Sequence, residues 1–252
     1  MELLEIKDLS LSFGGIIALA NLDMTVREGE LHAVIGPNGA GKTSLFNCIS
    51  GVYCPTSGDI LLSGKSITDL KPYEIAEQGV ARTFQNIELF KNMSVIDNLL
   101  LGCHTHMTSG PFSGALFFGK AVRQEIENRL HVEKIIDFLE IEKVRKKLVG
   151  TLPYGMQKRV EIGRALAMNP RILLLDEPVA GMNVEETEDI ARFVLDIKED
   201  MGITIILVEH DMGVVMDIAD RISVLDFGCK ISEGTPAEVQ SDPKVIAAYL
   251  GQ

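Results

Sequence analysis

The sequence is poor in three features, and each absence excludes a class of protein. Its four cysteines are too sparse for a disulfide-stapled fold and lack the paired spacing of metal ligands, which favours a reducing compartment. No apolar run is long enough and free enough of charge to span a bilayer. A formal net charge of −12 argues against a broad electrostatic grip on nucleic acid or anionic lipid, and leaves a local basic patch open. We therefore expect any membrane association to run through a protein partner.

The first residues of the chain also lack a basic region followed by an apolar stretch, so a secretion signal is not expected. With 252 residues, 46% of them hydrophobic, the chain can bury one large core, or a core with a subdomain. We expect a single domain over residues 1–252, because the length leaves no room for a second copy of it.

What the sequence does contain is a glycine-rich segment, residues 36–43, that reads Gly-Pro-Asn-Gly-Ala-Gly-Lys-Thr. Its spacing is that of a loop that wraps the phosphates of a nucleotide. Glycine lets backbone N–H groups approach phosphate oxygens, while Lys42 would neutralise the outer phosphates and Thr43 would ligate Mg²⁺. An apolar strand is predicted before the loop and a helix after it, which places the phosphates at a helix N-terminus. The alternative is a glycine-rich turn that binds nothing.

Two apolar runs farther along the chain end in polar side chains. Residues 172–175 lead into Asp176 and Glu177, and residues 203–208 lead towards His210. Runs of this kind are typical of central parallel strands, whose carboxyl ends share one edge of the sheet. There Asp176 can hold Mg²⁺ through water and Glu177 can polarise an attacking water. His210 can hydrogen-bond the terminal phosphate and orient that water. For each residue an ordinary structural role is the alternative.

The remaining patterns predict the fold class. Alternating apolar residues near the start, and again over residues 58–62, predict antiparallel strands. Apolar strands alternate with helices after residue 170, which predicts right-handed βαβ crossovers. We therefore expect an α/β protein with a mainly parallel P-loop NTPase core, an N-terminal antiparallel β subdomain and an inserted α-helical subdomain at roughly residues 88–168.

Within the inserted subdomain we expect a loop over residues 103–119 and a charged helix over residues 121–147. The loop contains Phe112, Phe117 and Phe118, for which we expect local burial rather than contact with a partner. The helix has an apolar stripe that begins with three residues and continues with three more. The stripe consists of Val122, Ile126 and Leu130, then Ile135, Ile136 and Leu139.

The order of these elements resembles that of the ATP-binding cassette (ABC) ATPases over essentially the whole chain. The resemblance implies that residues 36–43 are the Walker A loop, and that ATP and Mg²⁺ are bound. It implies catalytic roles for the Walker B neighbour Glu177, the switch histidine His210 and Gln85. It implies nucleotide contacts by Phe13, Gly36, Pro37, Asn38, Gly39, Ala40, Gly41, Lys42, Thr43 and Ser44, and metal contacts by Thr43, Gln85 and Asp176.

The family's signature segment is matched only in part, by Leu-Pro-Tyr-Gly-Met-Gln at residues 152–157. In a head-to-tail dimer, the resemblance implies that Pro153, Tyr154 and Gly155 complete the ATP site of a second copy. Proline supplies no hydroxyl, so backbone groups of Tyr154 and Gly155 are expected to act there instead. Asn183 stands where many family members carry aspartate, which keeps hydrogen-bonding capacity and loses charge.

A nearer resemblance is to the ATPase subunits of branched-chain amino-acid importers, on three segments: Leu-Pro-Tyr-Gly, Glu-Pro-Val-Ala-Gly-Met-Asn and the insertion that contains Phe-Ser-Gly. It implies a homo- or heterodimer bound to transmembrane permease subunits at the cytoplasmic face of the membrane. An importer of urea or other amides, a lipopolysaccharide exporter and a nucleotide-dependent scaffold with little hydrolysis stay open. A P-loop kinase or GTPase would not need the segment 152–157 before Asp176 and His210.

Overall fold

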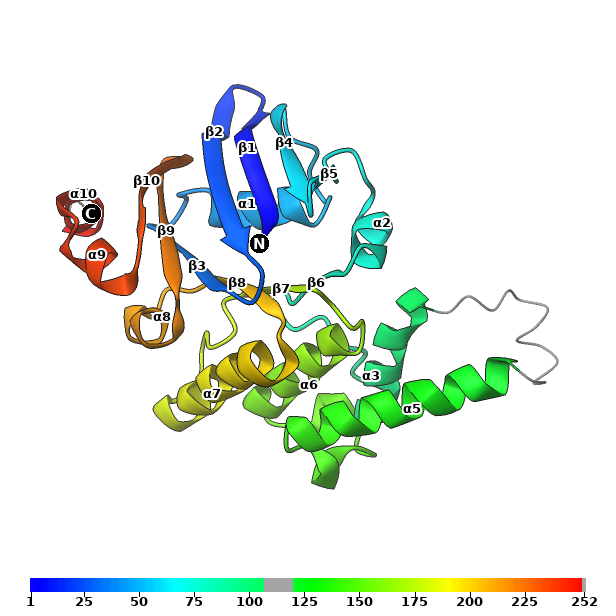
Figure 1. Ribbon diagram of the computed structural model, residues 1–252. Helices are drawn as coiled ribbons and strands as arrows, with labels where there is room; N and C mark the ends of the chain where they lie inside the picture. The colour runs from blue at the N-terminus through cyan, green and yellow to red at the C-terminus, as the bar shows by residue number, and fades with distance from the viewer. Residues whose placement is uncertain (107–119, 251–252) are drawn as a thin grey trace. The chain divides into compact units, whose positions relative to one another are not determined.

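The computed structural model describes residues 1–106 and 120–250, which form two compact units (Figure 1). One unit comprises Met1–Gln85 with Arg171–Gln252, and the other comprises Asn86–Pro170. Most of the predicted loop 103–119, with its three phenylalanines, lies outside the described residues. Of that loop the structure describes only Cys103–His106, which form a short 3₁₀ helix, η1.

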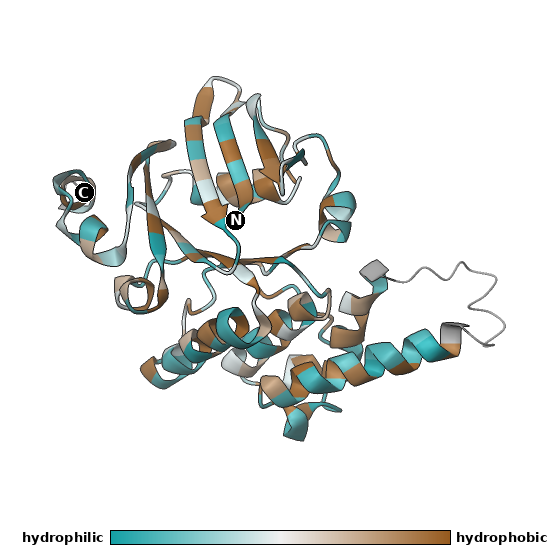
Figure 2. Ribbon diagram, viewed as in Figure 1, coloured by the Kyte–Doolittle hydropathy of each residue, from teal (hydrophilic) through white to brown (hydrophobic). Residues whose placement is uncertain are grey.

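The first unit begins with a four-stranded antiparallel sheet in the order β2-β1-β4-β5. Apolar and polar residues alternate along β1 and β2 (Figure 2), so the residues on one face, such as Leu4, Ile6 and Met24, are buried. The predicted antiparallel strands are thereby confirmed. The strands are β1 (Glu2–Phe13), β2 (Ile16–Arg27), β4 (Ser57–Leu62) and β5 (Lys65–Ser66).

A second sheet in the same unit has six strands in the order β10-β9-β3-β8-β7-β6. All neighbours are parallel except β10, which is antiparallel to β9, so the predicted mainly parallel core is confirmed. Every residue of β3, β7 and β8 is buried, as expected for mainly apolar central strands. Each strand also contains one buried polar residue, namely His32, Asp176 and Thr204. The strands are β3 (Leu31–Ile35), β6 (Val80–Arg82), β7 (Ile172–Asp176), β8 (Thr204–Val208), β9 (Arg221–Asp226) and β10 (Cys229–Gly234).

Helix α1 contributes to the same core as both sheets. Its Leu45, Phe46 and Ile49 belong to one buried cluster with residues of the antiparallel sheet and of β3, β7 and β8. This packing fixes the start of α1, and with it the loop between β3 and α1. The helices of this unit are α1 (Lys42–Ile49), α2 (Pro72–Glu77), α7 (Val184–Met201), α8 (Met212–Ile218), α9 (Pro236–Ser241) and α10 (Pro243–Leu250).

The second unit is helical where it is described. It consists of α3 (Val95–Gly102), α5 (Lys120–Phe138) and α6 (Tyr154–Leu166), with short 3₁₀ turns at η1 (Cys103–His106), η2 (Glu142–Val144) and η3 (Val149–Thr151). The predicted helix over residues 121–147 is too long, because α5 ends at Phe138 and Glu140 takes a left-handed conformation with φ 56°. Among the described residues, no helix combines the length and apolarity that crossing a membrane requires.

The predicted apolar stripe of α5 is correct only in its second half. Ile135, Ile136 and Leu139 are buried, whereas the first three members are exposed by 37 to 60%. In the described part of this unit, α5 has nineteen residues and contacts two shorter helices. These are α3, with eight residues, and α6, with thirteen. The exposed residues are Val122, Ile126 and Leu130.

Candidate nucleotide-binding site

The glycine-rich loop of residues 36–43, which we call the phosphate-type loop, connects β3 to the first turn of α1, as the sequence predicts. Gly36 and Gly41 have positive φ angles of 149° and 105°. A Cβ on Gly36 would lie 2.0 Å from the carbonyl oxygen of Leu225, and one on Gly41 would lie 2.6 Å from that of Ala18. Both positions therefore require glycine, and the loop packs tightly against β9 and β2.

Lys42 is the first residue of α1, and its side chain is bound inside the loop. Nζ donates to the carbonyl oxygens of Gly36 at 2.6 Å and Pro37 at 3.0 Å. Burial lowers the pKa of this ammonium group, and the nearby carboxylates of Glu177 and Asp176 oppose the shift. The loop thus holds a buried cation beside its backbone N–H groups, which suits a bound polyphosphate.

The three predicted catalytic side chains meet in a hydrogen-bonded cluster. Gln85 Nε2 donates to Glu177 Oε2 at 2.9 Å, and His210 Nε2 lies 2.8 Å from Glu177 Oε1. Glu177 follows β7, His210 follows β8 and Gln85 follows β6, so the cluster forms at the carboxyl edge of the parallel sheet. Glu177 has a left-handed φ of 48°, a strained conformation that is common at functional sites.

A hollow of about 390 Å³ joins this cluster to the phosphate-type loop. It is within the size range of pockets that hold small molecules. Three apolar residues of β2 that the sequence did not single out also line it, which gives the hollow an apolar wall. The lining residues are Ile16, Ile17, Ala18, Asn38, Gly39, Ala40, Gly41, Lys42, Thr43, Ser44, Gln85, Glu177 and His210.

Asp176 is 3% exposed and does not line the hollow. Its Oδ2 accepts a hydrogen bond from Arg82 Nη2 at 2.9 Å, an ion pair that the sequence did not reveal. Arg82 Nη1 also donates to Asn47 Oδ1 at 2.7 Å and Ser50 Oγ at 3.0 Å. The arginine thereby links the end of β6 to α1 and to the end of β7.

The oxygen donors at this edge of the sheet suit Mg²⁺, which needs few protein ligands, better than a metal ion that is held by protein side chains alone. The Thr43 hydroxyl, the Gln85 amide oxygen and the Asp176 carboxylate are oxygen ligands of the kind that Mg²⁺ prefers. No group of three or more His, Cys, Asp and Glu residues in the described ranges could hold a metal ion. Mg²⁺ does not need such a group, because it keeps several waters and binds substrate phosphates.

Phe13, the predicted adenine-stacking residue, lies at the end of β1 and is 46% exposed. It does not line the hollow. Its ring meets that of Tyr53 edge to face, with the ring centroids 5.1 Å apart. The sequence did not point to Tyr53, which lies in the irregular segment between α1 and β4.

The signature-like residues lie in the second unit, at the start of α6. Pro153 is the N-cap residue and makes no side-chain capping hydrogen bond. Tyr154, the first residue of the helix, is 43% exposed, and Gly155 is buried. Gln157 Nε2 donates back to the carbonyl oxygen of Leu152 at 2.8 Å, which holds the turn that enters α6. Backbone N–H groups, and not a side chain, therefore define this helix end.

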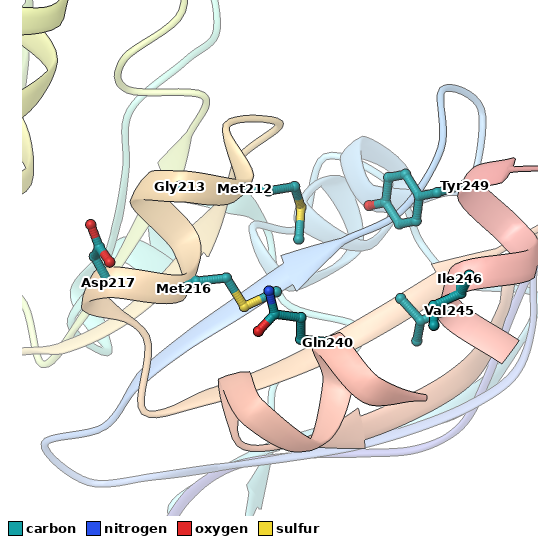
Figure 3. Close-up of a pocket in the computed structure, with 8 residues that line it drawn as sticks. All are labelled: Met212, Gly213, Met216, Asp217, Gln240, Val245, Ile246 and Tyr249. Atoms are coloured by element: carbon teal, nitrogen blue, oxygen red, sulfur yellow. The ribbon is translucent and has the colours of Figure 1, made fainter. Parts of the chain in front are cut away.

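A second hollow of about 420 Å³ lies among α8, α9 and α10 (Figure 3). Its walls are mainly methionine and aliphatic side chains, and neither lysine nor arginine lines it, so it does not suit phosphates. The hollow beside Lys42 is therefore the candidate nucleotide site. The lining residues of the second hollow are Met212, Gly213, Met216, Asp217, Gln240, Val245, Ile246 and Tyr249.

A glycine loop against a helix N-terminus, a parallel sheet and a carboxylate at the sheet's edge together define the class of P-loop nucleotide-binding proteins. Comparison with known families then narrows the class. A family model described as ABC transporter matches residues 19–180, and one described as branched-chain amino acid ATP-binding cassette transporter matches residues 229–252. The chain belongs to the ABC transporter ATPase family.

Individual relatives can be aligned with nearly the whole chain. The high-affinity branched-chain amino acid transport ATP-binding protein BraF of Pseudomonas aeruginosa is 40% identical, over 99% of this chain and 98% of its own length. A nucleotide-free ATP-binding cassette from an ABC transporter is 35% identical, with a TM-score of 0.87 and full coverage of both chains. A dimeric cassette in a post-hydrolysis state, bound to ADP and phosphate, is 25% identical, with a TM-score of 0.76 over 92% of this chain and 98% of its own.

Proposed function

We propose that this chain is the ATP-hydrolysing subunit of a membrane importer for branched-chain or related amino acids. The observation that carries the proposal is Glu177, held between Gln85 and His210 at the rim of the hollow that Lys42 lines. The ATPase subunit does not itself hold the transported molecule, so its site does not indicate the substrate class. The choice of substrate class is supported by the likeness to BraF.

The proposed reaction assigns one task to each residue. The backbone N–H groups of residues 38–43 and the Lys42 ammonium bind the phosphates of ATP. Glu177 accepts a proton from water while the water oxygen bonds to the γ-phosphorus, and the bond from that phosphorus to the ADP oxygen breaks. His210 keeps the Glu177 carboxylate aimed at the water.

Mg²⁺ would be held by Thr43 and Gln85, and by Asp176 through water. When bound, it would neutralise negative charge that develops on the phosphate oxygens. The residues present fit this role through their oxygen donors, although Asp176 is also paired with Arg82.

We further propose that two copies, or one copy and a related ATPase, close head to tail over two ATP molecules. Pro153, Tyr154 and Gly155 of one copy would then complete the site of the other, through the exposed start of α6. The dimeric cassette described above supports the formation of a dimer. Closure would exclude bulk water from the γ-phosphate and keep the water that Glu177 activates. After hydrolysis the two copies would separate and move the permease subunits at the cytoplasmic face of the membrane.

The test compares the unmodified chain with Glu177→Gln and Lys42→Ala. Phosphate release by the unmodified chain should depend on Mg²⁺ and ATP, and Glu177→Gln should lower kcat by about 100-fold or more. With Mg²⁺ and ATP, Glu177→Gln should elute as a stable dimer on size exclusion, whereas Lys42→Ala should stay monomeric. Hydrolysis by Glu177→Gln at the normal rate would show that Glu177 is not the base. Absence of phosphate release by the unmodified chain would favour a nucleotide-dependent scaffold.

The substrate requires the complete transporter. The chain would be reconstituted into proteoliposomes with the membrane subunits encoded beside it and with a binding protein, if one is encoded there. ATP-dependent uptake of labelled leucine, with no uptake of urea, is the expected result. Uptake of urea alone, or export of lipid, would assign the chain to another transporter of the same family.

A further inference from the structure

Glu209 is a buried carboxylate beside the candidate site that the proposed mechanism does not use. It follows β8 directly, is 3% exposed and does not line the nucleotide hollow. Its Oε1 accepts the backbone N–H of Val179 at 2.9 Å. Its Oε2 accepts the backbone N–H of His210 at 2.9 Å, and that of Asp211 lies at 3.5 Å.

These bonds join two loops that are far apart in the sequence. Val179 lies two residues after Glu177, in the loop that follows β7, while His210 lies in the loop that follows β8. A second bond reinforces the same junction, because the N–H of Glu177 donates to the carbonyl oxygen of Val208 at 2.8 Å. The backbone on either side of the Glu177–His210 contact is thus fixed by hydrogen bonds across the two strands.

A carboxylate is costly to bury, so its place here needs a physical reason. Burial raises the pKa of Glu209, its backbone hydrogen bonds lower it, and the charge of Glu177 raises it further. Only a carboxylate presents two oxygens that both accept, which lets one side chain hold N–H groups of two loops at once. An apolar side chain of the same size would leave the buried N–H of Val179 and the partly buried N–H of His210 without this acceptor.

We propose that Glu209 is a positioning residue for ATP hydrolysis, which sets the separation between the loop of Glu177 and that of His210. The inference deepens the proposed function and rests on it. Glu209 acts by holding His210 Nε2 within 2.8 Å of Glu177 Oε1, and it does so without touching the nucleotide. Loss of either accepting oxygen weakens the junction between the two loops, which the bond from the Glu177 N–H to the Val208 carbonyl still reinforces.

The first test is Glu209→Gln, which keeps the volume and replaces one oxygen with an NH₂ group that cannot accept. Phosphate release should show kcat lowered about 10- to 100-fold, because misplacing catalytic groups by about 1 Å has effects of this order. KM for ATP should stay within about twofold, since the phosphate-binding residues are unaffected. An unchanged kcat would overturn the proposal.

A double-mutant cycle separates positioning from general stability. Single-turnover rates with protein in excess would be measured for Glu209→Gln, His210→Ala and the double variant. If Glu209 acts through His210, the double variant should be no slower than His210→Ala alone. Losses that multiply would mean that Glu209 acts elsewhere, and would overturn the proposal. A crystal structure of Glu209→Gln gives a readout that does not need activity, since the distance from His210 Nε2 to Glu177 Oε1 should exceed 3.5 Å.

Glu233→Gln is the matched control. Glu233 is a partly buried carboxylate that is likewise held by hydrogen bonds, but its partners are Arg221 on β9 and Lys230 on β10. Its kcat should equal that of the unmodified chain. If the unmodified chain releases no phosphate, the proposed function fails. If it does release phosphate, and Glu209→Gln does so equally fast, only the role of Glu209 fails.

Discussion

Arg82 and Asp176 form an ion pair in which Nη2 lies 2.9 Å from Oδ2, and both side chains are less than one-tenth exposed. The guanidinium also lies over the rings of Phe46 and Phe84, at 5.5 and 5.2 Å from their centroids. The carboxylate proposed to assist Mg²⁺ is therefore already compensated by a buried cation. This arrangement makes Arg82 a structural requirement of the site.

We expect Arg82→Met to lower the free energy of unfolding by about 3–5 kcal/mol, because it leaves the charge of Asp176 buried and unpaired. Urea denaturation at neutral pH measures the loss. The double variant Arg82→Met with Asp176→Asn removes that charge, and should regain part of the stability. Equal stability of the single and double variants would contradict the role assigned to this pair.

Gly36→Ala and Gly39→Ala test the close packing of the phosphate-type loop without nucleotide. Both glycines have positive φ, so each substitution should cost about 1–2 kcal/mol of unfolding free energy through backbone strain. Only Gly36 lies against backbone, with its added Cβ 2.0 Å from the oxygen of Leu225, and it should cost about 1–3 kcal/mol more. Urea denaturation of the two variants side by side measures the difference. Equal losses would refute the argument from packing.

Glu233 should contribute stability that depends on pH. Burial raises the pKa of its carboxyl, but hydrogen bonds from Lys230 and Arg221 outweigh burial and bring the pKa below its ordinary value of 4.5. Since the folded-state pKa is the lower one, the contribution is fully present above about pH 4.5 and is lost as the pH falls through the folded-state pKa. Unfolding free energies of the unmodified chain and Glu233→Gln should therefore converge in acid. A difference that stays constant down to pH 3 would contradict the shift.

The four thiols should fall into two classes. Cys54 and Cys229 are exposed, whereas Cys48 and Cys103 are buried. Burial raises the pKa of Cys48 to about 11 and also raises that of Cys103, so little thiolate forms on either. Ellman's reagent at pH 8 should label two thiols rapidly in the folded protein, and the other two only after unfolding. Rapid labelling of all four would mean that both α1, which carries Cys48, and η1, which carries Cys103, open readily.

Much of the core could be predicted from the sequence because its signals are local and strong. The runs that became β7 and β8 are apolar apart from Thr204 and lead into charged residues, so both the strands and the edge that carries Glu177 and His210 follow from the pattern. The loop before Lys42 has a spacing that few other structures require. Its strand–loop–helix context was therefore also predictable.

The rest depends on contacts between distant parts of the chain. Strand β6 has only three residues, too few for a periodic pattern, so Arg82 gave no sign that it would meet Asp176. Glu209 is the charged residue next to a buried strand, and the sequence does not show that Val179 would donate to it. The stripe on α5 has the period of a buried face, yet Leu130 is exposed. Whether such a residue is buried depends on the neighbouring helices and not on the pattern of its own helix.

The contacts of Lys42 bear on how readily the loop accepts a ligand. Its ammonium group donates to the carbonyl oxygens of Gly36 and Pro37, so groups of the chain itself hold the curvature of the loop. A bound phosphate would replace these carbonyl oxygens as the acceptor of the Lys42 hydrogen bonds. Little conformational entropy of the loop is therefore lost on binding. Because hydrogen bonds are exchanged, the net binding free energy is smaller than that of the new hydrogen bonds alone. This favours release of the nucleotide after hydrolysis.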